Sequence, residues 1–244
     1  MKLIRPQWSA PPGVHAICTT RLGGVSEPPY HSFNLSPHVG DSKNAVSENR
    51  KRLGTVLPAP PCWLRQAHTS RVMRAEQVMP DCSVADAAYT FSADVVCAVI
   101  CADCMPVLFC SADGAGVAAA HAGWRGLAAG VLENTAALLR ANGAGALLAW
   151  IGPAISAEHY EVGEEVRTAI CRDAADEESF TPVGKGKWLA DLPALARRRL
   201  DGLNIVCAGY NGCTFTDARH FFSARRQAVT GRMAALIWRT KAGE

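Results

Sequence analysis

The sequence predicts a mixed α/β fold in a single domain that spans residues 1–244. Short apolar runs of strand length at residues 95–100, 106–110 and 117–120 are followed by a longer segment, residues 127–140, whose apolar residues recur at helical spacing. No repeat, low-complexity linker or shift in composition divides the chain. Apolar residues make up 49% of the chain and charged residues 19%, which is typical of a globular domain with a sizeable core.

Turn and capping residues divide the first part of the chain into segments. Gly23 and Gly24 follow the first strand and predict a turn or a close backbone approach. Asp41 or Ser42 caps a helix that ends before Gly54. The predicted segments are, in order, a strand at 14–20, an irregular loop at 28–41, a helix at 42–53, a short strand at 62–68 with Gln66 and His68 on one face, a loop at 81–93 and a buried strand at 95–100.

A β-hairpin is predicted next, because two apolar runs flank residues 111–116 and Asp113-Gly114 is a common hairpin turn. Antiparallel pairing outward from this turn brings Cys104, before the first strand, close to His121, after the second. A thiol beside an imidazole is compatible with a nucleophile and its base, with two metal ligands, or with packing alone.

The remaining segments close the domain. They are a helix at 127–140, a strand at 146–151, a helix at 161–172, an exposed loop at 173–187, a helix at 191–200, a strand at 205–209, an edge segment at 213–216 and a closing segment at 221–238. Residues 121–126 link a strand to the start of a helix, where free amides and the helix dipole suit an anion. The arginines of the closing segment are expected to form either a solvated face or a substrate-facing patch, and charge alone favours the solvated face; they are Arg225, Arg226 and Arg232.

Composition restricts the class of protein. A net charge of +3 is too small to argue for nucleic acid or a membrane surface as partner. The N-terminus has no signal-peptide pattern and no run of about 18 apolar residues occurs, so we expect a cytoplasmic protein without membrane contact. In that compartment the ten cysteines are expected to be thiols.

Several motifs stand in order along the chain and cover nearly all of it. They are Thr20-Arg21-x-Gly23-Gly24-x-Ser26, Asn34-Leu35, Gln66-x-His68, Ala102-Asp103-Cys104-x-Pro106, His121-Ala122-Gly123-Trp124-Arg125-Gly126, Ile151-Gly152-Pro153, Tyr160-Glu161-Val162-Gly163, Cys213-Thr214, Ser223-x-Arg225-Arg226 and Gly231-Arg232. Together they resemble the bacterial laccase-domain family, whose members are labelled multicopper polyphenol oxidase, purine nucleoside phosphorylase or peptidoglycan editing factor. The resemblance implies an α/β (α+β) domain of mixed sheets flanked by helices, similar to the cytotoxic necrotizing factor-like cysteine hydrolase fold.

The resemblance also implies a zinc site formed by His68, Cys104 and His121. The hairpin already joins Cys104 to His121, whereas His68 comes from the resemblance alone. Two imidazoles and one thiolate leave a fourth position of zinc for water or substrate. Copper, with Met105 as an axial ligand, is an alternative. None of the seven histidines stands two residues from another, although multicopper centres use many imidazoles in such pairs, so we rank an oxidase lower.

The activity implied by the resemblance is phosphorolysis of purine nucleosides, with adenosine deamination alongside it. Adenosine, inosine, guanosine or methylthioadenosine would react with phosphate to give the base and ribose 1-phosphate. We expect Arg21 and the amides of Gly123 to Arg125 to bind phosphate. Asp103 would face the ribose, act as a base or orient a metal ligand, and Asn34 would be a weaker substrate contact.

Two other functions stay open at this point. A peptidoglycan-precursor hydrolase would use Cys104 as nucleophile and His121 as its base, without a metal. A non-enzymatic, zinc-dependent partner of a ligase or a cell-wall enzyme would show no turnover. The sequence decides neither the physiological substrate nor the oligomeric state.

Overall fold

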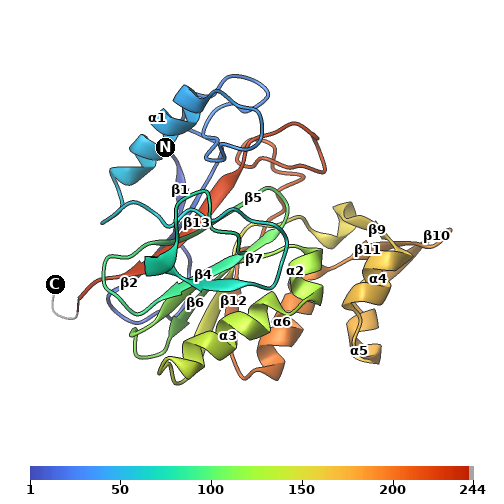
Figure 1. Ribbon diagram of the computed structural model, residues 1–244. Coiled ribbons are helices and arrows are strands. Elements are labelled where there is room, and N and C mark those ends of the chain that lie inside the picture. The colour runs from blue at the N-terminus through green and yellow to red at the C-terminus, as the bar shows by residue number, and fades with distance from the viewer. Residues whose placement is uncertain (242–244) are drawn as a thin grey trace.

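Two β-sheets packed face to face form the centre of the computed structural model, which describes residues 1–241 (Figure 1). The four-stranded sheet has the spatial order β1 (Leu3–Ile4), β2 (Val14–Thr19), β13 (Met233–Arg239) and β5 (Cys97–Cys101). The six-stranded sheet has the order β12 (Val206–Gly209), β8 (Leu147–Ile151), β6 (Met105–Ser111), β7 (Val117–Ala122), β4 (Ala87–Thr90) and β3 (Val72–Arg74). The pairs β12–β8 and β3–β4 are parallel and β6 is antiparallel to both of its neighbours, so the expectation of mixed sheets is confirmed.

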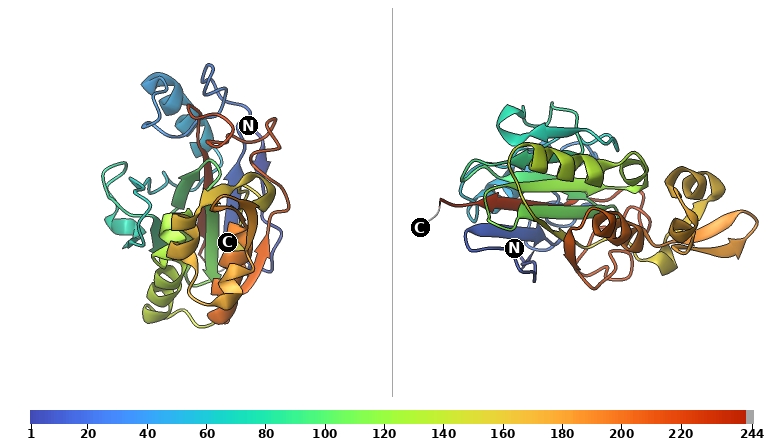
Figure 2. Two further views of the ribbon diagram at one scale, coloured as in Figure 1. Left: turned by 90° about the vertical axis from the view of Figure 1, so that its right-hand side faces the viewer. Right: turned by 90° about the horizontal axis from the view of Figure 1, so that it is seen from below.

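Alternation along the strands builds a layered core. In β6, Leu108 and Cys110 pack between the two sheets, whereas Val107 and Phe109 face the helices. Successive side chains of a strand point to opposite faces, so one strand contributes to two hydrophobic layers. The helices α2 (Trp124–Ala128), α3 (Val131–Ala141) and α6 (Leu192–Gly202) cover the outer face of the six-stranded sheet, and α1 (Lys43–Gly54) lies on the side of the four-stranded sheet (Figure 2).

Side-chain caps are present at the predicted starts of two helices. Ser42 precedes α1 and its side chain accepts a hydrogen bond from the amide of Ala45. Asp191 precedes α6 and accepts from the amide of Ala194 at 2.8 Å. Each cap satisfies one of the amides that the first turn of a helix leaves without a partner.

A small third sheet projects from one side of the molecule (Figure 2). It consists of β10 (Phe180–Gly184), β11 (Lys187–Ala190) and β9 (Glu161–Gly163), and it carries α4 (Glu164–Ile170) and α5 (Ala174–Glu177). The predicted helix over 161–172 is present only as α4, because β9 takes its first residues, and the prediction of a loop over 173–187 is wrong, because that range contains α5 and β10. Pairing of Val162 with Trp188 forms this sheet, and a contact so distant in sequence leaves no local periodic signal.

Three further predictions also differ from the structure. Residues 62–68 form no strand, because their amides bond to several different segments: Cys62 donates to Val96 and Arg65 donates to Ser83. Residues 81–93 are not only a loop, since they contain β4 between β7 and β3. Alanine has low strand propensity, and the pairing of β4 with β7 overrides it. Residues 213–216 make a single bridge, Ala154 to Cys213, in place of a strand.

Among residues 1–241, none of the helices combines the length and apolar character that crossing a bilayer requires.

Candidate metal centre

The β6–β7 hairpin places Cys104 beside His121. Its turn contains Gly114 at φ +74°, a conformation that glycine adopts without a steric cost. The strand register pairs Pro106 with His121, so Cys104, two residues before Pro106, lies next to the imidazole. The hairpin predicted from the sequence is therefore confirmed.

His68 completes a cluster of three potential metal ligands. Its Nε2 atom lies 4.0 Å from Cys104 Sγ, and its ring meets the ring of His121 edge-on with centroids 4.9 Å apart. One nitrogen or sulfur atom from each of the three residues lies within 4.8 Å of the others. His68 has φ +58°, so a left-handed backbone turn brings a residue 36 positions before Cys104 to the cluster.

The three side chains fit a metal ion. Bond lengths of about 2.0–2.3 Å to tetrahedral zinc set ligand atoms about 3.5 Å apart, close to the spacing of the cluster. A thiolate with two imidazoles is a donor set for zinc or copper and unsuited to magnesium or calcium. The cluster can therefore hold a metal with one coordination position left for another ligand.

Asp86 connects His121 to the segment that carries His68. Its fully buried carboxylate accepts hydrogen bonds from His121 Nδ1 at 2.9 Å, from the amides of Ala67, His68 and Thr69, and from the Thr69 hydroxyl. An ionised carboxylate only accepts hydrogen bonds, so His121 carries its proton on Nδ1 and its Nε2 is left for the cluster. One side chain thus sets the orientation of His121 and the path of the segment that carries His68.

Ionisation of the cluster follows from these contacts. Burial raises the pKa of the Cys104 thiol, but the charge and hydrogen bond of His121 and the hydrogen bond of His68 outweigh it and lower this pKa to about 6. Burial lowers the pKa of His121, and Cys104 and Asp86 reverse this effect and raise it to about 9. The pKa of Asp86 falls to about 2, because hydrogen bonds from His121 and Thr69 exceed the effect of burial. The thiolate is the form that binds a metal or attacks a substrate.

Gly123 provides space for the cluster. A Cβ atom at this position would lie 2.8 Å from Cys104 Sγ and 3.1 Å from a ring carbon of His68. Gly123 precedes α2, which has only five residues. Its role in the structure is thus the close approach of the backbone to two of the ligands.

Asp103 is part of the turn that carries Cys104. It has φ +88° and is almost fully buried. Its carboxylate accepts hydrogen bonds from the Thr214 hydroxyl at 2.6 Å, the Ser223 hydroxyl at 2.9 Å and the Arg225 amide at 2.7 Å. Because these three hydrogen bonds already occupy the carboxylate, we infer that Asp103 positions the turn that carries Cys104 and does not contact a substrate.

Two of the expected substrate contacts make intramolecular bonds. Arg21 donates to the carbonyls of His31 and Ala218 and lies over the ring of Phe222. Asn34 is fully buried and bonds to main-chain groups that include the amide of Arg232. Neither lines the cavity described next.

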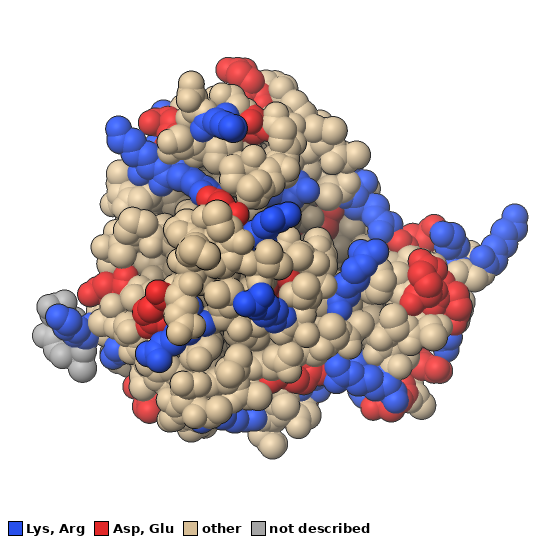
Figure 3. Space-filling view, in the orientation of Figure 1, with Lys and Arg blue, Asp and Glu red and all other residues tan. Residues whose placement is uncertain are grey.

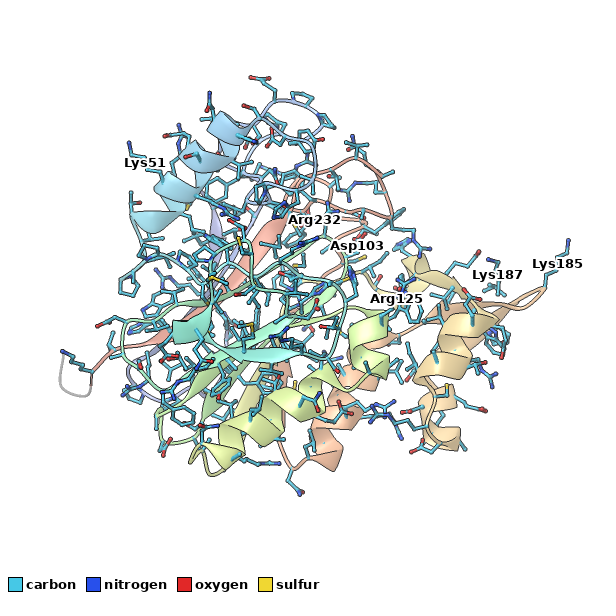
Figure 4. All side chains as sticks on the ribbon, in the orientation of Figure 1. Lys51, Asp103, Arg125, Lys185, Lys187 and Arg232 are labelled. Carbon is cyan, nitrogen blue, oxygen red and sulfur yellow. The ribbon has the colours of Figure 1, made fainter. Side chains whose placement is uncertain are left out.

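A cavity of about 530 Å³ opens beside the cluster, within the range of about 300–1,000 Å³ typical of ligand sites. His68, Cys104 and His121 line it together with Gln66, Arg65 and Arg232. Figure 3 shows a hollow with basic side chains around it, in the part of the molecule where Figure 4 labels Asp103 and Arg125. Arg125 is exposed and stacks on Trp124, outside the lining of the cavity.

Sequence reasoning missed Asp86 and misplaced Arg232. Asp86 lies in a segment that was predicted to be a loop. The only sequence feature that could have pointed to it is a single carboxylate among small apolar residues. The favoured prediction of a solvated face is wrong for Arg232, which is largely buried and lines the cavity, because β13 begins at Met233 in the centre of the molecule. The side-chain amide of Gln66 donates a hydrogen bond to the carbonyl of Ile100 and accepts one from the Ile100 amide, as the main chain of a neighbouring strand would.

The similarity to known proteins extends over nearly the whole chain. The family described as multi-copper polyphenol oxidoreductase laccase matches residues 15–240. The chain belongs to this laccase-domain family. The likeness inferred from the motifs is thereby confirmed.

Curated members of the laccase-domain family align over their full length. Purine nucleoside phosphorylase YfiH of Escherichia coli is 49% identical over 241 residues, which cover 97% of this chain and 98% of the relative. Purine nucleoside phosphorylase PA4543 of Pseudomonas aeruginosa is 47% identical over 241 residues, with 96% and 97% covered.

Solved structures share the fold. Protein NMB0706 of Neisseria meningitidis superposes with a TM-score of 0.93 at 42% identity and covers 99% of this chain and 100% of its own. YlmD of Geobacillus stearothermophilus has a TM-score of 0.84 at 28% identity, with 98% and 100% covered. The layered α/β architecture of this chain is therefore that of the laccase-domain family.

The family is described as multi-copper, but the described residues of this chain do not form several metal sites. Within residues 1–241 a single group of three or more potential His, Cys, Asp or Glu ligands has metal-binding spacing. That group offers one metal position.

Proposed function

We propose that this protein is a zinc-dependent purine nucleoside phosphorylase that converts a purine nucleoside and phosphate to the free base and ribose 1-phosphate. The observation that carries the proposal is the His68, Cys104 and His121 cluster beside a ligand-sized cavity. Relatives named purine nucleoside phosphorylase, 42–49% identical along the chain, support the choice of reaction.

The chemistry needs a polarised substrate, a bound phosphate and controlled protonation. A divalent zinc ion supplies a Lewis acid with a free coordination position when it is bound to the cluster. Asp86 keeps the proton of His121 on Nδ1, and the thiolate form of Cys104 remains available at neutral pH. The cavity holds cationic side chains for phosphate.

The site residues of this proposal have distinct roles. His68, Cys104 and His121 are metal ligands, and Asp103 acts through the turn that carries Cys104. We retain Arg21, Asn34, Gly123 and Arg125 as supports of the site, because each contacts a segment next to it and none lines the cavity. Adenosine deamination would use the same ligands and is a second activity to be measured.

The decisive experiment is incubation of the purified protein with inosine or adenosine, with and without phosphate. Phosphorolysis requires that ribose 1-phosphate and free base appear together and only when phosphate is present. Formation of inosine from adenosine measures deamination. Consumption of neither nucleoside would contradict the proposed function.

The metal assignment has its own test. Protein purified without added metal should contain about one zinc per chain, and His68→Ala should abolish this content because a site with one histidine and one cysteine binds zinc weakly. The control is His15→Ala, since His15 is exposed on β2 and stacks on Trp238. Elemental analysis of both variants checks the result, and copper in place of zinc would contradict the assignment.

A second candidate is a cysteine hydrolase, because Asp86, His121 and Cys104 are arranged as carboxylate, base and nucleophile. This activity would act on amide or ester bonds, for example in a peptidoglycan precursor, and would persist in chelator. The zinc phosphorylase would lose activity there. Activity measured before and after chelation thus separates the two functions.

A further inference from the structure

Arg232 is the cation whose position in the cavity is most constrained. Its Nη1 donates to the carbonyls of Thr230 at 2.8 Å and Gly231 at 3.0 Å, which fixes one edge of the guanidinium. Its backbone amide donates to Asn34, so the residue is anchored at both ends. Arg232 lines the same cavity as the three metal ligands, and Figure 4 shows it in the central part of the molecule near Asp103.

The other edge of the Arg232 guanidinium is free. Within residues 1–241, Nε and Nη2 have no hydrogen-bond acceptor, and neither is sealed from solvent. No carboxylate in this part of the chain forms an ion pair with Arg232. The nearby carboxylate of Asp103 already accepts from Thr214, Ser223 and Arg225. Two donors of a fixed charge, on a residue that lines the cavity, therefore lack an internal partner.

Two other partly buried or buried arginines of the molecule are paired with carboxylates. Arg50 forms a two-bond ion pair with Asp81, and Arg199 pairs with Asp176. A largely buried cation is costly unless it is paired, so an unpaired one beside a ligand-sized cavity indicates an anionic ligand. Two parallel N–H donors match two oxygens of a phosphate.

We propose that Arg232 is the phosphate-binding residue of this site and that it takes the inorganic phosphate co-substrate through Nε and Nη2. This inference rests on the proposed phosphorylase function. It assigns phosphate binding to a residue that shares the cavity with Cys104 and the two histidines. Arg21 and Arg125, which were expected to bind phosphate, lie outside the cavity lining.

The test compares Arg232→Gln, Arg232→Lys and the wild type, all metal-loaded. Loss of a charge-assisted pair of hydrogen bonds should raise the KM for phosphate by about 10- to 100-fold in Arg232→Gln, with the KM for inosine changed by less than about twofold. Arg232→Lys should lie between, because lysine keeps the charge and loses the fork. Arg140→Gln is the control, since Arg140 lies on α3 and bonds to the carbonyl of Leu203.

Calorimetric titration with inorganic phosphate gives a readout that needs no turnover. Wild type and Arg140→Gln should bind phosphate equally, and Arg232→Gln should bind it about 10- to 100-fold more weakly, with unchanged zinc content and unfolding midpoint. If Arg232→Lys and Arg232→Gln both bind phosphate as the wild type does, or if the KM for inosine rises instead, the assignment is wrong. If phosphate binding depends on Arg232 but no nucleoside is consumed, the assignment of the anion site stands and the proposed phosphorylase function is wrong.

Discussion

Asp86 is the residue on which the geometry of the cluster depends most. One carboxylate receives five hydrogen bonds from the segment that carries His68 and from His121. Its burial makes these bonds obligatory, because an unsatisfied carboxylate or amide in the interior is costly. The metal ligands are thus positioned by a residue that does not touch the metal itself.

Substitution Asp86→Asn should weaken metal binding and the fold together. The amide cannot accept from all five donors, so we expect about 10- to 100-fold lower zinc affinity and a free energy of unfolding lower by about 1–3 kcal/mol. Zinc titration with a competing chelator and urea unfolding measure the two effects. Asp201→Asn, at an exposed position of α6, is the control, and equal behaviour of the two variants would show that Asp86 has no special role.

Gly123 allows a second prediction at this scale. The new methyl group of Gly123→Ala would lie 2.8 Å from Cys104 Sγ, so the ligands must shift, at a cost of about 1–3 kcal/mol. We expect reduced zinc content in a folded protein. Gly202→Ala is the matched control, because nothing lies within 4 Å of a Cβ there. Normal zinc content in Gly123→Ala would refute the steric argument.

At the level of elements, three separate parts of the chain meet at the site. The β6–β7 hairpin supplies Cys104 and His121, the irregular segment before β3 supplies His68, and the segment before β13 supplies Arg232. Asp103 ties the first of these to residues 214–225 through its three hydrogen bonds. The site therefore depends on contacts between elements that are far apart in sequence.

Asp103→Asn tests whether this residue positions the turn or acts as a base. Asparagine tolerates a positive φ, so the turn can remain, while loss of charge-assisted hydrogen bonds should lower the free energy of unfolding by about 1–3 kcal/mol. Urea unfolding and the rate of nucleoside turnover are measured side by side. A fall in kcat of more than about 100-fold at unchanged stability would instead assign general-base catalysis to Asp103.

For the whole molecule, bound metal couples the site to global stability. A ligand that binds only the native state stabilises it, so removal of zinc with a chelator should lower the Tm. The same treatment should make Cys104 reactive towards an alkylating reagent, since the thiolate loses its metal.

Peptide mass spectrometry provides internal controls for this experiment. Cys82 is exposed and should react equally with and without chelator. Cys110 is buried and burial raises the pKa of its thiol to about 12, so it should stay unmodified in the folded protein. Equal labelling of Cys104 before and after chelation would mean that this thiol is not a metal ligand.

The sequence by itself determined the features that depend on neighbours along the chain. The β6–β7 hairpin follows from two apolar runs around Asp113-Gly114, and the caps Ser42 and Asp191 follow from local hydrogen bonding. Local turn geometry also placed Cys104 next to His121. Likeness to the laccase-domain family, carried by ordered motifs, added His68.

Tertiary structure alone decided the features that depend on distant partners. The strands β4 and β9 exist because β7 and β11 pair with them, although at least half of the residues in each have low strand propensity. Asp86 becomes a positioning residue only when His68 and His121 meet around it, and Arg232 faces the cavity only because β13 enters the central sheet. Burial and hydrogen-bond satisfaction are properties of the packed chain, so no local sequence pattern encodes them.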